Sequence, residues 1–314
     1  MSAILHSVRH PSSASTSTSG LASNLRTAGL AAGLMSMALV GVALIANLAV
    51  AADNVDSGRA QTLAWTFGLT TTGFVVLKTG IALTLIGILL RIKDRIDAVK
   101  SSLPALAPAS NHEPANAAEV DTGFGRVART ARALGPLPIH TMAKKLWAPM
   151  VLMGPMLVMA GLVLSLIQSN TGVAADFVDL AAWVQGLQFL GEGLILAGIS
   201  ILLGTILGEL RRGGGEVQEA LGVTVWTLKM PLSAKAFVGL MAAGLMAAMA
   251  QFVLYLVATS VDNPSTWFAV LGPLREVALG LLLSGIVLAL FTIGTVLGFQ
   301  FDRMRTLIRG EEQS

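Results

Sequence analysis

One long apolar stretch, Trp183–Arg212, constrains the fold of this chain more than any other feature of its sequence. It has an acidic residue near its start, Glu192, and arginines at its exit. A second stretch, Trp65–Lys93, aligns with it without a gap, and a third, Trp267–Arg303, aligns more weakly. The repetition predicts a fold built from repeated units. The second stretch shares Trp, Gly and Leu at 65/183, 68/186 and 69/187, Gly at 73/191 and 80/198, and Ile at 81/199, and the third keeps Trp267, Leu271, Leu274, Glu276 and Ser284 in register.

Each of these stretches follows another apolar run, at 28–52, 148–168 and 236–261. The runs reach about 20 residues, the length of helix that crosses ~30 Å of hydrocarbon. Only 12% of the residues are charged and 54% are hydrophobic, whereas a soluble domain carries about a quarter charged residues. A soluble core buries one all-round hydrophobic helix but not six. We therefore expect an all-α fold, a polytopic membrane helical bundle whose six transmembrane helices form three tandem hairpin repeats of the same orientation.

The repeats divide the chain into alternating tails, hairpins and linkers. Residues 1–26 are rich in Ser and Thr, which predicts a disordered tail. The run at 21–52 is either the first span or a cleavable signal peptide, and its length favours a span because a signal peptide has only ~7–15 apolar residues. The predicted division is tail 1–26, hairpin 27–100 (spans 28–52 and 64–91), linker 101–146, hairpin 147–212 (spans 148–168 and 182–208), linker 213–235, hairpin 236–303 (spans 236–260 and 270–300) and tail 304–314.

The distribution of basic residues predicts the orientation in the membrane. All of the 21 Lys and Arg except Arg59, Lys78 and Arg275 lie in the tails or in the connections between hairpins. Short positively charged loops stay in the cytoplasm. We therefore expect both termini in the cytoplasm, the plasma (bacterial inner) membrane as the location, and the lipid bilayer as the main partner. The same rule accounts for the net charge of +3, so we expect no nucleic-acid partner.

The two linkers contain patterns of their own. The Pro-, Ala- and Asn-rich segment 101–125 predicts a flexible connection. Three arginines at steps of three follow it, within 125–134, and indicate either an interfacial helix on anionic headgroups or a solvated loop helix. Residues 216–231 form a second candidate interfacial segment. The three arginines are Arg126, Arg129 and Arg132.

Small residues recur within the predicted spans at spacings that allow close helix packing. Gly73, Gly80 and Gly87 repeat every seven residues, and three GxxxG pairs occur elsewhere. Without a hydrophobic force between helices in lipid, close backbone approach drives their association. We interpret these glycines as packing seams, with a glycine-lined pore as the alternative. The pairs are Gly29/Gly33, Gly204/Gly208 and Gly294/Gly298.

The chain lacks the residue patterns of catalytic and metal sites. It has no cysteine, which excludes disulfides, iron–sulfur clusters and thiol nucleophiles. Its four histidines lie in predicted tails and loops, and neither an HExxH motif nor a P-loop occurs. We therefore expect no enzymatic activity, no metal and no cofactor.

Polar residues inside the predicted spans are the remaining candidates for function. Lys78 lies 13 residues before Arg91, about 20 Å along a helix, where a charge costs about 2.5–3.5 kcal/mol. It is turned about 200° from Gly80 and so faces away from the glycine seam. Lys78 and Glu192 have an ion or proton role, form a structural ion pair, or reach the headgroups independently. The predicted intramembrane polar cluster comprises Lys78, Gln185, Gln188, Glu192 and Gln251.

Arg275 and Glu276 form a second polar group. They precede Arg303 by about 27 residues, or about 40 Å of helix, which predicts a pair at the outer interface. Nearby Trp residues at 65, 183 and 267 open the even spans and are typical of interfacial anchors.

Two functions fit these observations. The first is a non-catalytic membrane subunit or scaffold that docks a protein partner, or further copies of the chain. The second is an ion, proton or small-solute channel or transporter that uses Lys78 and Glu192. We favour the first, because a selective path requires more polar lining. The predicted docking surface is a cytoplasmic basic face of Arg126, Arg129, Arg132, Lys144 and Lys145.

Overall fold

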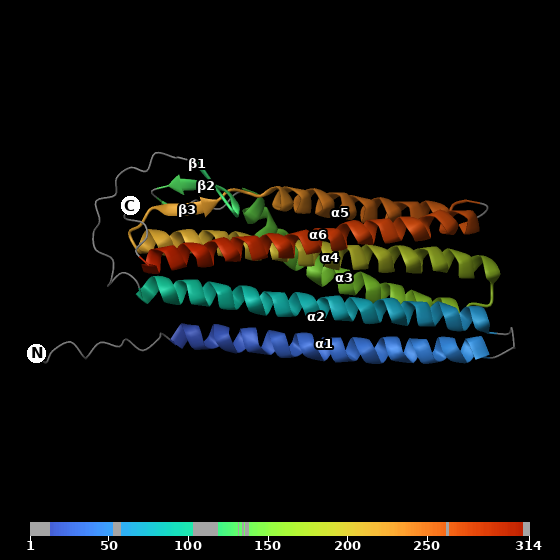
Figure 1. Ribbon diagram of the computed structural model, residues 1–314. Coiled ribbons are helices and arrows are strands. Elements are labelled where there is room, and N and C mark those ends of the chain that lie inside the picture. Colours follow the sequence, from blue (N-terminus) through green and yellow to red (C-terminus); the bar gives the residue numbers. More distant parts are fainter. Residues whose placement is uncertain are drawn as a thin grey trace, which may run out of the picture.

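The computed structural model describes residues 13–52, 58–102, 119–130, 132–133, 135, 138–261 and 264–309. Six helices within these residues are long and apolar enough to cross a membrane. They lie lengthwise beside one another, and three short strands lie at one end (Figure 1). In chain order the elements are α1 (Ser13–Ala52), α2 (Arg59–Ser102), β1 (Glu119–Thr122), β2 (Gly125–Thr130), α3 (Pro138–Ser169), α4 (Ala174–Ala220), β3 (Val225–Leu228), α5 (Leu232–Ala258) and α6 (Pro264–Arg309).

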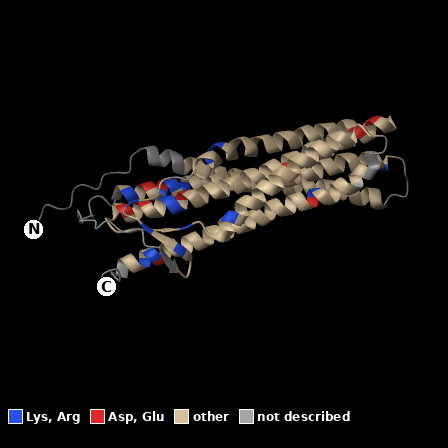
Figure 2. Ribbon diagram, turned by 90° about the horizontal axis from the view of Figure 1, so that it is seen from above, with Lys and Arg blue, Asp and Glu red and all other residues tan. Residues whose placement is uncertain are grey.

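The two ends of the bundle differ in charge. Lys, Arg, Asp and Glu gather at the end where α1 begins, α6 ends and the strands lie, and we call this the charged end (Figure 2). Helices that are consecutive in the chain pack side by side as the pairs α1–α2, α3–α4 and α5–α6. This arrangement confirms the predicted helical class, with six helices long and apolar enough to cross a membrane. That the helices insert in a membrane, that the pairs are repeats, and that they share one orientation stay predictions.

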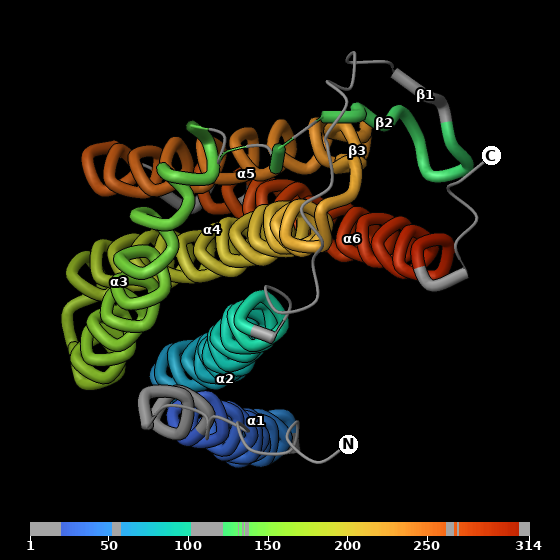
Figure 3. The backbone as a smooth tube through the Cα atoms, turned by 90° about the vertical axis from the view of Figure 1, so that its left-hand side faces the viewer, coloured from blue at the N-terminus to red at the C-terminus, as the bar shows by residue number. Residues whose placement is uncertain are grey.

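Helix α4 is the centre of the bundle. It packs against α2, α3, α5 and α6, which surround it in the end-on view of Figure 3. In its most apolar stretch 89% of the residues are buried, whereas only 11–33% are buried in the corresponding stretches of the other five helices. Helix α1 is at the opposite extreme, because among the described elements it packs extensively only on α2. The five outer helices therefore leave long apolar faces uncovered.

Glycines bring helix backbones close together at two crossings. On α2, a Cβ added to Gly80 would lie 2.7 Å from the carbonyl oxygen of Gly29 on α1. Between α3 and α4, a Cβ added to Gly154 would lie 2.7 Å from the carbonyl oxygen of Gly191. Side chains there would force the helices apart, which agrees with the predicted packing role. The pair at 294/298 does not form a helix seam, because no atom lies within 4 Å of a Cβ added to Gly294.

Several helices extend further than the predicted spans. Residues 13–26 belong to α1, which corrects the predicted disordered tail, and Ala22 there packs beside Gly87 of α2. Helix α4 continues through the predicted linker at 213–220, and Gly213 there permits close contact with Ile96 of α2. Lys100 Nζ of α2 donates to Glu216 Oε2 of α4 over 2.6 Å and holds the two extensions together.

The predicted interfacial helix at 125–134 is wrong, because residues 125–130 form strand β2. This strand pairs antiparallel with β1 on one side and with β3 on the other. Alternate residues of a strand face opposite sides, so Arg126 is exposed while Val127 is buried. Val127 and Leu228 pack with Phe299 of α6, which attaches the sheet to the bundle. The second predicted interfacial segment divides between the end of α4 and β3.

Some predictions lie outside the described residues. They concern the first part of the tail at 1–12, the loop at 53–57, most of the Pro-rich linker at 103–118 and the tail at 310–314.

Candidate functional site

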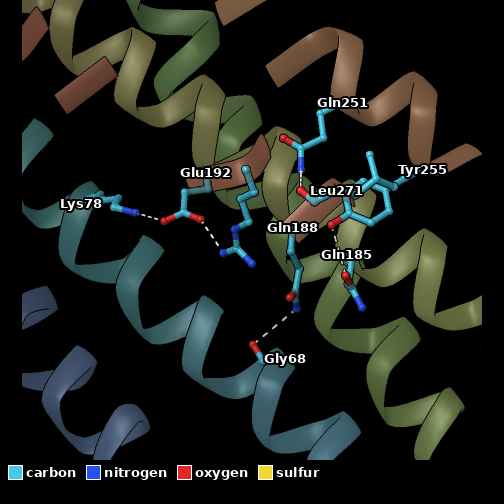
Figure 4. A network of polar contacts seen from close by, with 9 residues as sticks. Gly68, Lys78, Gln185, Gln188, Glu192, Gln251, Tyr255 and Leu271 are labelled. Carbon is cyan, nitrogen blue, oxygen red and sulfur yellow. Dashed lines mark hydrogen bonds and ion pairs between the residues drawn. The ribbon is translucent and has the colours of Figure 1, made fainter. Parts of the chain in front are cut away.

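The polar residues of α4 share one face of the helix because they occur at positions i, i+3 and i+7. They are Gln185, Gln188 and Glu192, and both Gln188 and Glu192 are buried. Figure 4 shows this face directed toward Lys78 of α2 and toward the α5 residues Gln251 and Tyr255. The structure thus brings together all five residues of the predicted polar cluster, at the place where α2, α4, α5 and α6 approach one another.

Glu192 is the centre of a three-residue ion cluster. Lys78 Nζ donates to Glu192 Oε1, as the dashed line in Figure 4 marks. Arg275 Nη2, on α6, donates to the other carboxylate oxygen, Oε2, over 2.8 Å. We call Lys78, Glu192 and Arg275 the ion triad. Both carboxylate oxygens are therefore occupied by cations from two different helices.

The structure separates Arg275 from Glu276, which the sequence analysis had placed together at the outer interface. Successive helix residues point about 100° apart. Arg275 consequently turns into the bundle, where its guanidinium carbon lies 5.8 Å from the Phe67 ring and 5.9 Å from the Phe189 ring. Glu276 remains exposed on the outside of α6. Arg275 thus belongs to the same cluster as Lys78 and Glu192.

Amide groups extend the polar network away from the ion triad. Gln188 Nε2 donates to the Gly68 carbonyl oxygen over 3.4 Å, and Gln251 Nε2 donates to the Leu271 carbonyl oxygen over 2.5 Å. The hydroxyl of Tyr255 donates to Gln185 Oε1 over 3.2 Å (Figure 4). Tyr255, the one tyrosine in the chain, was missed in the sequence analysis. Its position four residues after Gln251, on the same face of α5, is the signal that could have identified it.

The electrostatic balance of the site is positive. The ion triad has two cations and one carboxylate, enclosed by apolar helix surfaces. Three polar atoms near it, Gln188 Oε1, Gln251 Oε1 and Arg275 Nε, are buried without a hydrogen-bond partner within the described residues. An unpaired buried polar group costs about 1–3 kcal/mol. The cluster is therefore strongly bonded around Glu192 and incompletely bonded at its edges.

The predicted basic face is only partly available at the surface. Arg126, Arg132, Lys144 and Lys145 are exposed, but Lys144 is already paired. Arg129 instead stacks over the Trp226 ring, with its guanidinium carbon 4.3 Å from the ring centroid. Lys144 Nζ lies 2.5 Å from Glu209 Oε1. Three of the five predicted basic residues thus remain for a partner.

The described residues contain no group of three or more His, Asp or Glu side chains placed to hold a metal ion. Comparisons with protein-family models, with curated proteins and with solved structures find no match to this chain. Any functional assignment therefore depends on the geometry alone.

Proposed function

We propose that this chain is a non-catalytic, membrane-embedded subunit of a bacterial inner membrane, which holds a partner protein and has both termini in the cytoplasm. The observation that carries the proposal is the double occupation of Glu192 by Lys78 and Arg275. An ionisable residue inside a membrane span is a functional candidate by default. Here each carboxylate oxygen is already bound, so the group favours a structural connection between α2, α4 and α6 over a carrier that binds and releases.

The outer surfaces support the same interpretation. All five helices that surround or flank α4 expose long apolar side chains along their length, and α3 and α1 expose the most of them. A lipid bilayer or the apolar helices of a partner can cover such faces. Glu276 stands among the exposed residues of α6, between Val277 and Pro273. A carboxylate on an otherwise apolar outer face suits a cation supplied by a partner helix.

The charge distribution supports the proposed orientation. The charged end holds the strands, the extensions of α2, α4 and α6, and most Lys and Arg residues (Figure 2). By the positive-inside rule this end faces the cytoplasm. An acidic partner would then meet Arg126, Arg132 and Lys145 beside the small sheet.

Co-purification from native membranes tests this proposal. We expect a stoichiometric partner to accompany the tagged full chain, and we expect Arg126→Glu combined with Arg132→Glu and Lys145→Glu to release it. Arg305→Glu is the control, an exposed basic residue near the end of α6. Recovery of the chain alone from native membranes, or retention of the partner by the triple variant, contradicts the proposed docking surface.

A channel or transporter is the second candidate, and the positive balance of the ion triad favours it. The net positive charge and the unpaired Arg275 Nε suit an anion, and the unpaired amide oxygens suit water, on a path between the helices. Reconstitution in liposomes discriminates between the two functions. Ion, proton or solute flux that Glu192→Gln or Lys78→Met abolishes, and that Glu276→Gln leaves intact, would replace the subunit proposal with the transport function.

A further inference from the structure

An apolar groove separates α3 from α5 on the surface of α4, on the half of the bundle nearer the charged end. Its volume is about 270 Å³. A cavity of about 10–15 Å³ already holds one water molecule, so the groove has room for a chain of many small groups. We call it the α3–α5 groove. Its walls include Met142 and Leu146 of α3, Leu207 of α4, and Phe237 and Met241 of α5.

A small polar recess adjoins one end of the groove. His140 lines both the groove and the recess and therefore lies between them. The recess has a volume of about 20 Å³. We call it the basic recess, because Lys144, Arg211 and Arg212 line it together with a single carboxylate, Glu209.

Of the three cations that line the basic recess, Lys144 and Arg212 pair with Glu209, and Arg211 does not. Lys144 Nζ lies 2.5 Å from Glu209 Oε1, and Arg212 Nη2 lies 3.3 Å from Glu209 Oε2. Glu209 is thereby fully engaged. Arg211 Nε, by contrast, is buried without a hydrogen-bond partner among the residues described. The recess therefore has a cationic donor that no carboxylate of this part of the chain satisfies.

A second unpaired group points to the same place. The hydroxyl of Thr227, on β3, also lines the basic recess, and its residue is only 4% exposed. Its oxygen has no hydrogen-bond partner within the described ranges. Buried hydroxyls and guanidinium donors are normally bonded. A guanidinium N–H and a hydroxyl on two different elements are thus both available to one anionic ligand.

From these features we infer that the α3–α5 groove and the basic recess form one binding site for an anionic phospholipid of the surrounding membrane. One acyl chain lies in the groove, and the phosphate accepts hydrogen bonds from Arg211 and Thr227. Basic pockets between helices at the cytoplasmic side suit phosphate headgroups. The inference rests on the proposed membrane insertion, and it adds a ligand that neither the docking surface nor the ion triad involves.

The test counts lipids on the full chain by native mass spectrometry and titrates them by thermal shift in detergent. The probes are phosphatidylglycerol, phosphatidylcholine with the same acyl chains, and soluble glycerol phosphate. We expect one retained phosphatidylglycerol and a preference over phosphatidylcholine. A charge-assisted hydrogen bond is worth about 1.5–3 kcal/mol, so Arg211→Gln should weaken binding roughly ten- to hundredfold. Thr227→Val should weaken it less.

Two control variants separate the site from general effects. Arg126→Gln removes a cation from the exposed face of β2 and should leave lipid binding unchanged. Ala143→Phe fills the α3–α5 groove without changing any charge, and should weaken phosphatidylglycerol binding while glycerol phosphate still fails to bind. A variant whose melting temperature is lowered equally with both lipids is misfolded. The inference is then tested with the remaining variants.

Three outcomes overturn the inference. They are equal retention of the two phospholipids, an unchanged preference in both Arg211→Gln and Ala143→Phe, and a glycerol phosphate shift as large as that of phosphatidylglycerol. None of these outcomes bears on the proposed docking function, because that function is tested by co-purification of a partner protein. Release of the chain from membranes by alkaline carbonate would instead refute membrane insertion itself.

Discussion

Two of the carboxylates on helix α4, Glu192 and Glu209, each contact two cations and allow a direct comparison. The partners of Glu192 come from α2 and α6, and the side chains of Lys78 and Arg275 are only 17% and 19% exposed. The partners of Glu209 are Lys144 of α3 and Arg212 of α4 itself, with side chains 37% and 40% exposed. Both carboxylates are buried, with side chains 7% exposed at Glu192 and 4% exposed at Glu209. The difference lies in the cations, which are enclosed between three helices at Glu192 and reach water at Glu209.

The comparison shows that the surroundings determine what a pair contributes. Where water cannot solvate the partners, removal of one ion leaves the others without compensation. Where water is available, it replaces the lost partner. We therefore expect replacement of the carboxylate to destabilise the fold strongly at Glu192 and only slightly at Glu209.

The largest effect is expected for Glu192→Gln. It leaves Lys78 and Arg275 as uncompensated buried cations, and loss of one member of a buried pair costs about 3–5 kcal/mol. The free energy of unfolding in detergent, from denaturant titration, measures it. Glu276→Gln makes the same change at an exposed position and should alter that free energy by less than about 0.5 kcal/mol. Equal losses of unfolding free energy in Glu192→Gln and Glu276→Gln would contradict the idea that burial determines what the carboxylate contributes.

The next largest effect is a recovery of the free energy of unfolding. Replacing the whole ion triad by Met residues (Lys78→Met, Glu192→Met and Arg275→Met together) removes every buried charge at once. Apolar replacement of a complete buried ion group is often neutral or stabilising by about 1–4 kcal/mol. We therefore expect the triple variant to be more stable than Glu192→Gln in the same titration. A triple variant less stable than the single one would mean that the triad contributes more than charge compensation.

Glu209→Gln should have a smaller effect. Pairs with this degree of exposure contribute about 0–1 kcal/mol, because water and salt screen them. The variant should unfold at nearly the same denaturant concentration as the parent chain. A loss comparable to that of Glu192→Gln would show that the charged end is less hydrated than its exposure indicates.

The smallest effect is the response to salt. Raising the ionic strength from about 0.1 M to about 1 M shortens the screening length from about 10 Å to about 3 Å. The difference in unfolding free energy between the parent chain and Glu209→Gln should then disappear. The corresponding difference for Glu192→Gln should persist, because buried pairs are screened much less. A parallel decrease at both sites would remove the distinction between them.

The class of fold and the members of the polar cluster could be predicted from local spacing. The rotation between Gly80 and Lys78 gave the correct direction of the lysine, because helix geometry is the same in any surroundings. Arg275 was misassigned because its depth was counted from Arg303 as if the apolar span ended there. Helix α6 continues to Arg309, and Arg303 is buried against Gln218 and Thr224. A charged residue therefore does not mark the end of an apolar span when it lies in a part of the helix that packs beyond that span.

Other features depend on contacts that no local pattern reveals. The apolar stretches of α1 and α4 are about equally hydrophobic, although that of α1 is 11% buried and that of α4 is 89% buried. Hydropathy measures the residues and not their neighbours, so it cannot identify the central helix. The arginine spacing at 126–132 fits a helix as well as a strand. The deciding partner, β3, lies far along the chain.

The separation of β2 from β3 has a consequence for biosynthesis. Val225, the first residue of β3, is 95 positions after Thr130, the last of β2. A ribosome adds about 5–20 residues per second, so the hairpin of β1 and β2 exists for roughly 5–20 s before its third strand is made. During that interval α3 and α4 must be synthesised and brought back to the same end. The sheet can therefore be completed only after the middle helix pair has reached its place.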